Sequence, residues 1–154
     1  MHLQFRIRPV QDSDLDAVLV IEHASFGKDA YDRKLLAEYC HKCGDLFLVA
    51  EAGRRLCGYS LTCVRGERAE LVSIATLPAA RRTGVASTLL DSTLRRLRHR
   101  KVAHFSLIVR ETNGQAIRFY EKFRFQKVRI VRQYYEDGGD GVLMRRILRA
   151  KRPT

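Results

Sequence analysis

Apolar and polar positions follow two different periods along this chain, and the period changes at regular intervals. Alternation with a period of two, as in Phe5–Val10, is typical of a strand with one buried face. Apolar residues spaced three and four apart, as over 85–100, mark one face of a helix. These patterns predict strands at 5–10, 46–50, 55–64, 69–77, 103–109, 127–134 and 142–147. They predict helices at 15–24, 33–42, 85–100 and 115–123.

The predicted elements follow the order βααβββαβαββ. Residues 103–109 are almost all apolar, which is typical of a buried, parallel strand, and a helix connects them to the strand before. Hairpins are expected on either side of this crossover. The order therefore predicts a mixed sheet with helices on both faces, of the α/β or α+β class. We expect residues 1–154 to form a single domain with a basic tail from about residue 148.

Polar residues before two of the predicted helices are candidates for capping. Ser13 or Asp12 precedes the first helix, and Asn113 precedes the last one. Side-chain oxygens at this position accept hydrogen bonds from free backbone amides. The third helix ends in a run of basic residues, which suits the negative end of the helix dipole.

One stretch joins a strand to a helix through a basic turn that contains glycine. Pro78 ends the apolar run Leu71–Leu77, and the turn Arg81–Ala86 (RRTGVA) leads into the third helix. The first amides of a helix lack partners, the helix dipole is positive there, and Gly84 lets an anion approach. The pattern indicates a phosphate-binding site for a nucleotide-like cofactor. The alternative interpretation of Gly84 is an ordinary turn glycine.

Composition changes the picture chiefly through charge. The 154 residues carry a formal net charge of +12, with a pI of about 10.1. This charge favours anionic partners, such as phosphorylated cofactors, acidic proteins or nucleic acid, and disfavours polycationic substrates such as polyamines. No apolar run is long enough for a membrane span, and the first residues lack the apolar core of a secretory signal. The four cysteines form no disulfide-like framework, so we expect a reducing, cytoplasmic environment.

Two motifs resemble metal sites, but neither fits one. The four cysteines suggest zinc, yet Cys57 and Cys63 are six residues apart on one predicted strand, or about 20 Å. Both cannot bind one ion with bonds near 2.3 Å, so we interpret them as small buried apolar residues. Residues 137–141, rich in Asp and Gly, lack the twelve-residue pattern of a calcium loop and are interpreted as a turn. We therefore expect no metal.

Two blocks of the sequence resemble the GNAT N-acetyltransferase superfamily. The turn Arg81–Ala86 matches the family's acetyl-CoA loop, Gln/Arg-x-x-Gly-x-Gly/Ala. The block Leu107–Phe125 is similar to the family's "VR…N..A…Y.k.GF" signature, with Arg124 in place of the glycine. Arg132–Tyr135 and Asp140–Met144 resemble the tail of the branch that contains the ribosomal-protein alanine N-acetyltransferase and related protein N-terminal acetyltransferases. The resemblance implies a mostly antiparallel sheet of about seven strands with a splayed central parallel pair.

The resemblance also implies acetyl-CoA as the cofactor and transfer to an amine. Backbone groups of Ile74, Ala75 and Thr76 would pair with the pantetheine arm, and a backbone N–H there would polarise the thioester carbonyl. The alternative for these residues is plain sheet core. Asn113 would contact the cofactor as well as cap its helix. The residues expected to hold the pyrophosphate are Arg81, Arg82, Thr83, Gly84, Val85, Ala86 and Ser87.

Transfer to an amine needs a base and can use an acid for the departing thiolate. Tyr120 matches the family's acid position and stays protonated at neutral pH, although its spacing also suits a core aromatic. The family's ribosomal-protein enzyme has a glutamate where this chain has Ile108, so the base must lie elsewhere. Glu70 is preferred because its spacing from the loop glycine matches that of the base in histone-type lysine acetyltransferases. A solvent-facing strand residue is the alternative for Glu70, and Glu22 and His104 are further candidates.

The acceptor side is expected to involve Tyr134 and Tyr135, on a loop over the amine, together with Glu22. The alternative for the two tyrosines is strand-end aromatics. We expect an acetyl-CoA-dependent N-acetyltransferase that acts on a protein or peptide N-terminal α-amine. The alternatives are lysine or a small-molecule amine as the acceptor, or a basic module that binds CoA and nucleic acid without turnover. If the acceptor is ribosomal, the surrounding RNA would attract this basic chain.

Overall fold

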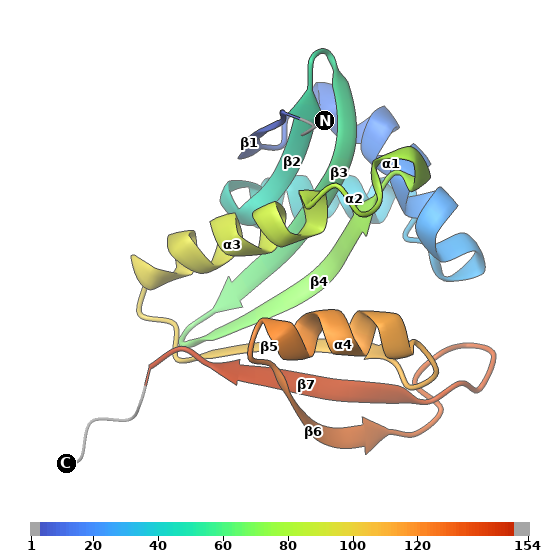
Figure 1. The fold of residues 1–154 in the computed structure, drawn as a ribbon, viewed down its shortest axis with the longest axis vertical. Coiled ribbons are helices and arrows are strands. Elements are labelled where there is room, and N and C mark those ends of the chain that lie inside the picture. Colours follow the sequence, from blue (N-terminus) through green and yellow to red (C-terminus); the bar gives the residue numbers. More distant parts are fainter. Residues whose placement is uncertain (1–3, 150–154) are drawn as a thin grey trace. The chain divides into compact units, whose positions relative to one another are not determined.

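The computed structural model describes residues 4–149 of the chain (Figure 1). The strands form one sheet in the order β1-β2-β3-β4-β5-β7-β6. They are β1 (Arg6–Pro9), β2 (Phe47–Ala52), β3 (Arg55–Arg65), β4 (Arg68–Thr76), β5 (His104–Arg110), β6 (Gln126–Val131) and β7 (Gly141–Ile147). The helices are α1 (Leu15–Phe26), α2 (Arg33–Lys42), α3 (Val85–Arg98) and α4 (Gly114–Lys122). The predicted order of elements and the mixed α/β class are confirmed.

Strands β4 and β5 run parallel, with Arg68–Glu70 opposite His104–Ser106. The pairs β1–β2, β2–β3, β5–β7 and β6–β7 are antiparallel. The predicted parallel pair, joined through α3, is therefore confirmed. The chain's contacts divide it into two compact units: unit 1 is Met1–Cys63 with Val72–Arg100, and unit 2 is Val64–Leu71 with Lys101–Thr154. The single domain expected from the sequence stays a prediction.

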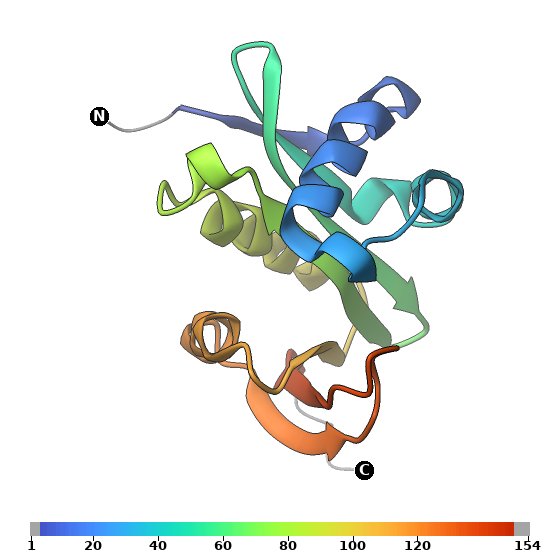
Figure 2. The same ribbon diagram turned by 90° about the vertical axis from the view of Figure 1, so that its right-hand side faces the viewer.

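Unit 1 has helices on both faces of its strands, and Figure 2 shows α2 and α3 on opposite sides of them. On one face, α1 and α2 contribute Val18, Ile21 and Leu36 to a buried cluster with strand residues such as Tyr59. On the other face, Leu89 of α3 belongs to a second cluster. The strand residues of unit 1 therefore need apolar side chains on both faces, and this explains the unbroken run of buried positions in β2 and β3.

The start of α3 lies very close to the strands because residue 58 is glycine. A Cβ atom at Gly58 would lie 2.7 Å from Cγ1 of Val85 and 3.0 Å from the backbone oxygen of Ala75. Val85 is only 1% exposed. A side chain at position 58 would push the first turn of α3 outward, so Gly58 fixes where the preceding basic turn lies.

Unit 2 has α4 against one face of its strands. Phe105 of β5 packs on Phe125 with ring centroids 5.4 Å apart, and Arg146 of β7 donates a hydrogen bond to the backbone oxygen of Phe123 (3.1 Å). Side chains alternate along a strand, so Ser106 and Ile108 point to the opposite face of β5. The two faces of unit 2 therefore differ: one is packed under α4, and the other carries Ser106 and Ile108.

The predicted cap of the first helix is wrong. Residues Asp12–Asp14 form a short 3₁₀ turn, and α1 follows it without a side-chain cap. The Asp14 carboxylate instead accepts a hydrogen bond from the Gln11 amide (2.8 Å) and forms an ion pair with Arg8. The predicted cap of α4 is confirmed, since Asn113 Oδ1 accepts from the amide of Ala116 (3.1 Å).

Two turns differ from their sequence patterns. Strand β6 ends at Val131 rather than at 134, because Gln133 adopts a φ of 53° and its amide donates to Asp140 Oδ1 (2.9 Å). Tyr134 therefore belongs to a turn. Arg124, which stands where the family signature has glycine, has a φ of 67°. The turn after α4 thus keeps a left-handed residue at a cost of about 1 kcal/mol.

The cysteines also differ from expectation. Cys43 and Cys63 form a disulfide, with Cα atoms 5.3 Å apart, so the expectation of no disulfide is wrong. The pairing was not visible in the sequence because it joins the end of α2 to β3, which are brought together only by the fold. Cys57 is buried and free, as predicted for a small apolar residue.

Two absences concern the described residues alone. Within residues 4–149, no group of three or more His, Cys, Asp or Glu side chains can hold a metal ion. Over the same range, every helix is too short or too polar to cross a membrane. Of the predicted basic tail, residues 150–154 lie outside the described part of the chain.

Candidate active site

The turn before α3 presents backbone amides that no side chain caps. Gly84 stands at the N-cap in the left-handed region, with a φ of 87°, and α3 has no side-chain cap. Helices α2 and α4 do have one, from Asp32 and Asn113. The amides of Val85–Ser87 begin the helix and therefore have no intrahelical acceptor. They are available to an anion at the positive end of the helix dipole.

Side chains of the same turn add positive charge. Arg81, Arg82 and Thr83 are exposed, and neither arginine has an acidic partner among the described residues. The Thr83 hydroxyl donates to the backbone oxygen of Ala80, and the Thr88 hydroxyl donates to that of Gly84 (2.9 Å). These two bonds hold the backbone on both sides of the glycine. The turn is thus ordered by its own contacts and fits a diphosphate.

Strand β4 runs up to this turn. Ile74 and Thr76 are half-buried on one face, and Ala75 is buried on the other. The amide of Leu77 donates to the backbone oxygen of Cys57 (2.8 Å), which ties the end of β4 to β3. Both the cofactor interpretation and the core interpretation of these residues agree with this placement. Their contact with pantetheine stays a prediction.

Glu22 is an internal residue of unit 1. Its side chain is 1% exposed, and it accepts hydrogen bonds from the Tyr31 amide (2.9 Å), the Ser73 hydroxyl (3.1 Å) and the Tyr59 hydroxyl. Burial raises the pKa of this carboxyl, and the bonds from Tyr31 and Ser73 partly offset the rise. These contacts favour a structural role, tying α1 to the segment before α2 and to β4. Contact between Glu22 and substrate stays a prediction.

Unit 2 brings Glu70 together with Tyr134. Glu70 pairs with Ser106 across the parallel strands, so it faces the side of β5 that is opposite α4. Tyr134 lies on the same side, because a Cβ atom on Gly141 would meet both Tyr134 and Ile108 there. Burial and the nearby charge of Glu70 both raise the pKa of its phenol. Glu70 itself is exposed. The predicted base and a predicted substrate residue are therefore neighbours.

Ile108 lies beside this pair. A Cβ atom on Gly141 would lie 2.7 Å from Cγ2 of Ile108 and 3.4 Å from Cβ of Tyr134. Ile108 and Tyr134 thus both pack over the bare backbone of Gly141. The position that carries a glutamate in the ribosomal-protein enzyme is an apolar wall here, next to an exposed carboxylate. His104, the third candidate base, has a buried Nδ1 without a hydrogen-bond partner in the described structure.

Tyr120 belongs to α4 and lies on the other side of β5. It is 9% exposed and packs edge-on against Phe125, with ring centroids 5.9 Å apart. Burial raises the pKa of its phenol, and an electrostatic contribution from Tyr135 adds to the rise. Tyr120 is therefore both a core aromatic and a phenol that stays protonated at neutral pH.

Arg110 is a residue that sequence reasoning missed. Its guanidinium lies over the ring of Tyr135, 4.0 Å from the centroid, and its Nη1 atom is 3.2 Å from Asp137 Oδ1. Asp137 in turn accepts from the amide of Gly139 (2.9 Å). Arg110 thus orders the turn that carries both tyrosines. The sequence signal that could have found it is a single arginine directly after the apolar run of β5.

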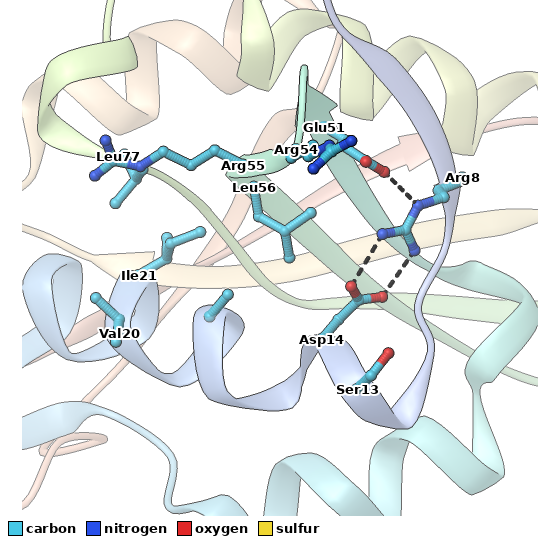
Figure 3. A pocket seen from close by; sticks show the side chains of 11 residues that line it. Arg8, Ser13, Asp14, Val20, Ile21, Glu51, Arg54, Arg55, Leu56 and Leu77 are labelled. Carbon is cyan, nitrogen blue, oxygen red and sulfur yellow. Dashed lines mark hydrogen bonds and ion pairs between the residues drawn. The ribbon is translucent and has the colours of Figure 1, made fainter.

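A pocket of ≈ 370 Å³ opens in unit 1, and none of the predicted site residues lines it. Figure 3 shows the guanidinium of Arg8 pointing at Asp14 and Glu51 in its wall. The Arg8–Asp14 and Arg8–Glu51 ion pairs both have N–O distances of 2.7 Å. Its apolar lining consists of Ala17, Val20, Ile21, Leu56 and Leu77. The charges of Arg8, Asp14 and Glu51 in this wall compensate one another, which indicates a role in stability.

The structure therefore divides the predicted site residues between the two units. Unit 1 contains Glu22, β4 residues 74–76 and the basic turn. Unit 2 contains Glu70, Asn113, Tyr120, Tyr134 and Tyr135. Each set is internally ordered by the contacts described above.

Comparison with known proteins decides the family. Residues 15–125 match the acetyltransferase (GNAT) family. The chain belongs to this family. It is 30% identical to an N-alpha-acetyltransferase of Saccharolobus solfataricus, over 94% of this chain and 93% of that protein. It is also similar to the crystal structure of Ard1 from Thermoplasma volcanium (26% identity, TM-score 0.90, 95% and 99% covered). A further similar structure is the ribosomal-protein-S18-alanine N-acetyltransferase of Escherichia coli (27% identity, TM-score 0.85, 97% of both chains).

Membership confirms the resemblance drawn from the sequence. This GNAT chain is an acetyltransferase and uses acetyl-CoA. Its residues fit that molecule, because the uncapped amides at the start of α3 and the unpaired Arg81 and Arg82 suit a diphosphate. A CoA-binding module without turnover is not favoured.

Proposed function

We propose that this protein transfers the acetyl group of acetyl-CoA to the α-amine of a protein N-terminus. The similarity to an N-alpha-acetyltransferase over nearly the whole length of both chains supports this acceptor. The observation that carries the chemistry is the placement of Glu70 beside Tyr134 and Ile108 on one face of unit 2. An exposed carboxylate next to an apolar wall suits a cationic group that must lose a proton.

Glu70 acts as the base in this proposal. An α-amine is largely protonated near neutral pH, and only its neutral form attacks a carbonyl carbon. The Glu70 carboxylate attracts the ammonium group and accepts its proton, directly or through one water. Tyr134 and Ile108 bound the space next to Glu70 and restrict how the first residue of the acceptor approaches.

Tyr120 acts as the acid. Acetyl-CoA supplies an activated thioester, and its thiolate is the group that leaves. Because burial raises the pKa of Tyr120, the phenol is protonated at neutral pH. It donates its proton to the sulfur as the thiolate leaves, and the phenolate then takes up a proton from water. Glu70 and Tyr120 lie on opposite faces of β5. The amine can thus approach from one face while the thiol departs toward the other.

The cofactor is held by backbone groups in this proposal. The amides of Val85–Ser87 and the side chains of Arg81 and Arg82 bind the pyrophosphate, and β4 backbone at residues 74–76 pairs with pantetheine. Asn113 contacts the cofactor from the start of α4. Gly58 supports the arrangement, since it lets α3 begin directly on the strands.

A peptide panel tests the acceptor class. Free thiol release is followed with acetyl-CoA and three acceptors: a peptide with a free N-terminus and no lysine, the same peptide with a blocked N-terminus and one internal lysine, and a small primary amine. Turnover with the first peptide alone supports the proposal. Turnover confined to the lysine peptide or to the small amine contradicts it.

A narrower proposal concerns the surroundings of the acceptor. The similarity to an enzyme named for ribosomal protein S18, together with the net charge of +12, favours a cytoplasmic acceptor close to ribosomal RNA. Acetylation of ribosomal particles should then be faster than that of the matching free peptide, and salt should remove the difference. Equal rates at low salt contradict this narrower proposal.

A further inference from the structure

One face of unit 2 is open and carries unpaired positive charge. We define the open face as the side of β5, β7 and β6 that lies opposite α4. Its rows follow from the strand register: Ser106 is opposite Arg145, Ile108 is opposite Leu143, and Leu143 is opposite Arg129. Residues opposite one another across strands point to the same side, so these side chains share the face with Glu70.

Among the described residues, Arg129 and Arg145 of the open face lack acidic partners, whereas Arg110, on the same side of β5, lies 3.2 Å from Asp137 Oδ1 through its Nη1 atom. Arg129 and Arg145 are exposed, and within residues 4–149 neither forms an ion pair. The one hydrogen bond of the Arg145 side chain is a long one, from Nε to the Ser106 hydroxyl (3.4 Å). By contrast, Arg146 on the α4 side is tied to the Phe123 backbone. The two arginines are therefore free to meet anions of a ligand.

Leu143 and Ile108 lie between these arginines and Tyr134. Both are half-buried apolar residues, and Tyr134 is 48% exposed beside them. The open face thus has Arg68 and Glu70 on β4, the apolar pair Ile108 and Leu143 across β5 and β7, and two arginines farther out. Arg145 is two strands away from Glu70 and Arg129 is three strands away. A polyanion such as RNA would meet the carboxylate unfavourably, whereas a peptide with a positive N-terminus and acidic residues after it matches the whole series.

We propose that the open face binds the segment that follows the acceptor's N-terminus and selects acidic side chains there. This inference rests on the proposed transfer to an α-amine at Glu70. Neighbouring strands are about 4.8 Å apart, so Arg145 lies about 10 Å from Glu70 and Arg129 about 15 Å. An extended peptide advances about 3.3 Å per residue after the first, so the arginines meet about the fourth and fifth residues of the acceptor. The substrate class is therefore a protein whose N-terminus precedes an acidic stretch.

Three peptides and two double variants test this selection. The peptides share their first two residues and differ at positions three to five, which are all acidic, all neutral amide or all basic. The enzyme forms are the natural chain, R129E/R145E, and R95E/R98E, which makes the same change of charge at exposed positions of α3 in unit 1. CoA affinity by calorimetry and the melting temperature check that each variant is folded.

The natural chain should prefer the acidic peptide over the neutral one by about tenfold in kcat/KM, since exposed charge pairs each change affinity about two- to fivefold. The preference should shrink in high salt, reverse in R129E/R145E and persist in R95E/R98E. If all three peptides react equally well, the inference is wrong while the proposed function stands. If no peptide reacts although CoA binds, the proposed function fails and the inference with it.

The binding of a short fluorescent oligouridine tests the alternative that the open face binds nucleic acid. Loss of its binding in R129E/R145E, together with peptide rates that do not depend on charge, would assign the open face to nucleic acid and overturn the inference. Oligouridine binding that R129E/R145E leaves unchanged, together with a peptide preference that this variant reverses, supports it.

Discussion

Glu70 and Tyr134 are neighbours on one face of unit 2, where burial and the charge of Glu70 raise the pKa of Tyr134. The two residues come from the two separate segments of unit 2, and the β4–β5 register puts Glu70 on the face of β5 that also carries Ile108. Ile108 packs beside Tyr134 over Gly141. The chain therefore has an exposed carboxylate on β4 close to the apolar side chain of Ile108 on β5.

The substitution Glu70→Gln should remove the base and leave the fold intact. Glu70 is exposed and holds no ion pair within the described residues, so its loss should change the free energy of unfolding by less than about 0.5 kcal/mol. We expect kcat to fall by roughly a hundredfold or more, because general-base catalysis contributes about that much. Steady-state kinetics with a free-N-terminus peptide measure the fall.

The matched control for this variant is Glu67→Gln. Glu67 is an exposed glutamate in the turn before β4 and loses the same charge on substitution. It should keep the natural rate. A Glu70→Gln enzyme with a normal kcat would show that the base lies elsewhere.

A carboxylate at position 108 should restore activity to Glu70→Gln. Ile108 lies on the same face and one strand away, so Ile108→Glu places a base close to the same reaction space. We expect the double variant to regain at least about tenfold in kcat over the single variant. Because position 108 is half-buried, the new carboxyl should have a raised pKa, and the recovery should grow as the pH increases from about 5 to 8. A double variant as slow as Glu70→Gln would contradict a shared role for these positions.

Tyr120→Phe separates the acid role from packing. The ring stays in place against Phe125, so kcat should fall by at least about tenfold while the affinity for CoA changes little.

The buried phenol of Tyr120 should also make the free energy of unfolding depend on pH. The folded-state pKa of Tyr120 is raised, so its contribution is present below about pH 10 and is lost as the pH rises above the unfolded value.

Urea unfolding at about pH 9 and pH 11 measures this signature. The natural chain should lose more stability between the two pH values than Tyr120→Phe does, since all other titrating groups are shared. Equal losses would show that the phenol is not shielded from ionisation.

Gly58→Ala should weaken CoA binding although position 58 lies outside the basic turn. The added Cβ meets Val85 Cγ1 at 2.7 Å and the Ala75 oxygen at 3.0 Å, so the start of α3 must move. We expect a loss of about 1–3 kcal/mol in unfolding free energy and a weaker Kd for CoA. Gly44→Ala is the control, because nothing lies within 4 Å of a Cβ there and its backbone needs no positive φ. Unchanged CoA affinity in Gly58→Ala would contradict the packing argument.

Most of the fold was predictable because each element carries its own local signal. The period of the α3 sequence, the apolar run of β5 and the cap at Asn113 each depend on neighbouring residues alone, and all three are confirmed. The geometry of the basic turn was also predictable, since a strand, a glycine and a helix start follow one another directly in sequence. Its glycine is required by a φ of 87°.

The remaining features depend on residues that are distant in sequence. The disulfide of Cys43 and Cys63 needs the end of α2 to reach β3. The buried bonds of Glu22 need Tyr59 and Ser73 from two different strands, so the sequence showed only a glutamate on the first helix and suggested a place near the substrate. No local pattern marks such pairs, because burial and hydrogen bonding are decided by packing rather than by periodicity.

Arg8→Met should destabilise the protein without affecting catalysis. The Arg8 side chain is 18% exposed and holds Asp14 and Glu51, so its removal leaves two partly buried carboxylates without their cation. We expect a loss of about 3 kcal/mol in unfolding free energy.

The stabilisation from the Arg8–Asp14 pair should depend on pH. The hydrogen bond from Arg8 is the main cause that lowers the pKa of Asp14, so this stabilisation is present above about pH 4 and is lost as the pH falls below that value. The gap between the natural chain and Arg8→Met, measured by urea unfolding, should therefore be widest near neutral pH and narrow in acid. Arg55→Met, at an exposed arginine on the same pocket, is the control and should change stability by less than about 0.5 kcal/mol. A gap between the natural chain and Arg8→Met that is the same at pH 7 and pH 3 would show that the ion pair with Asp14 contributes nothing to folding.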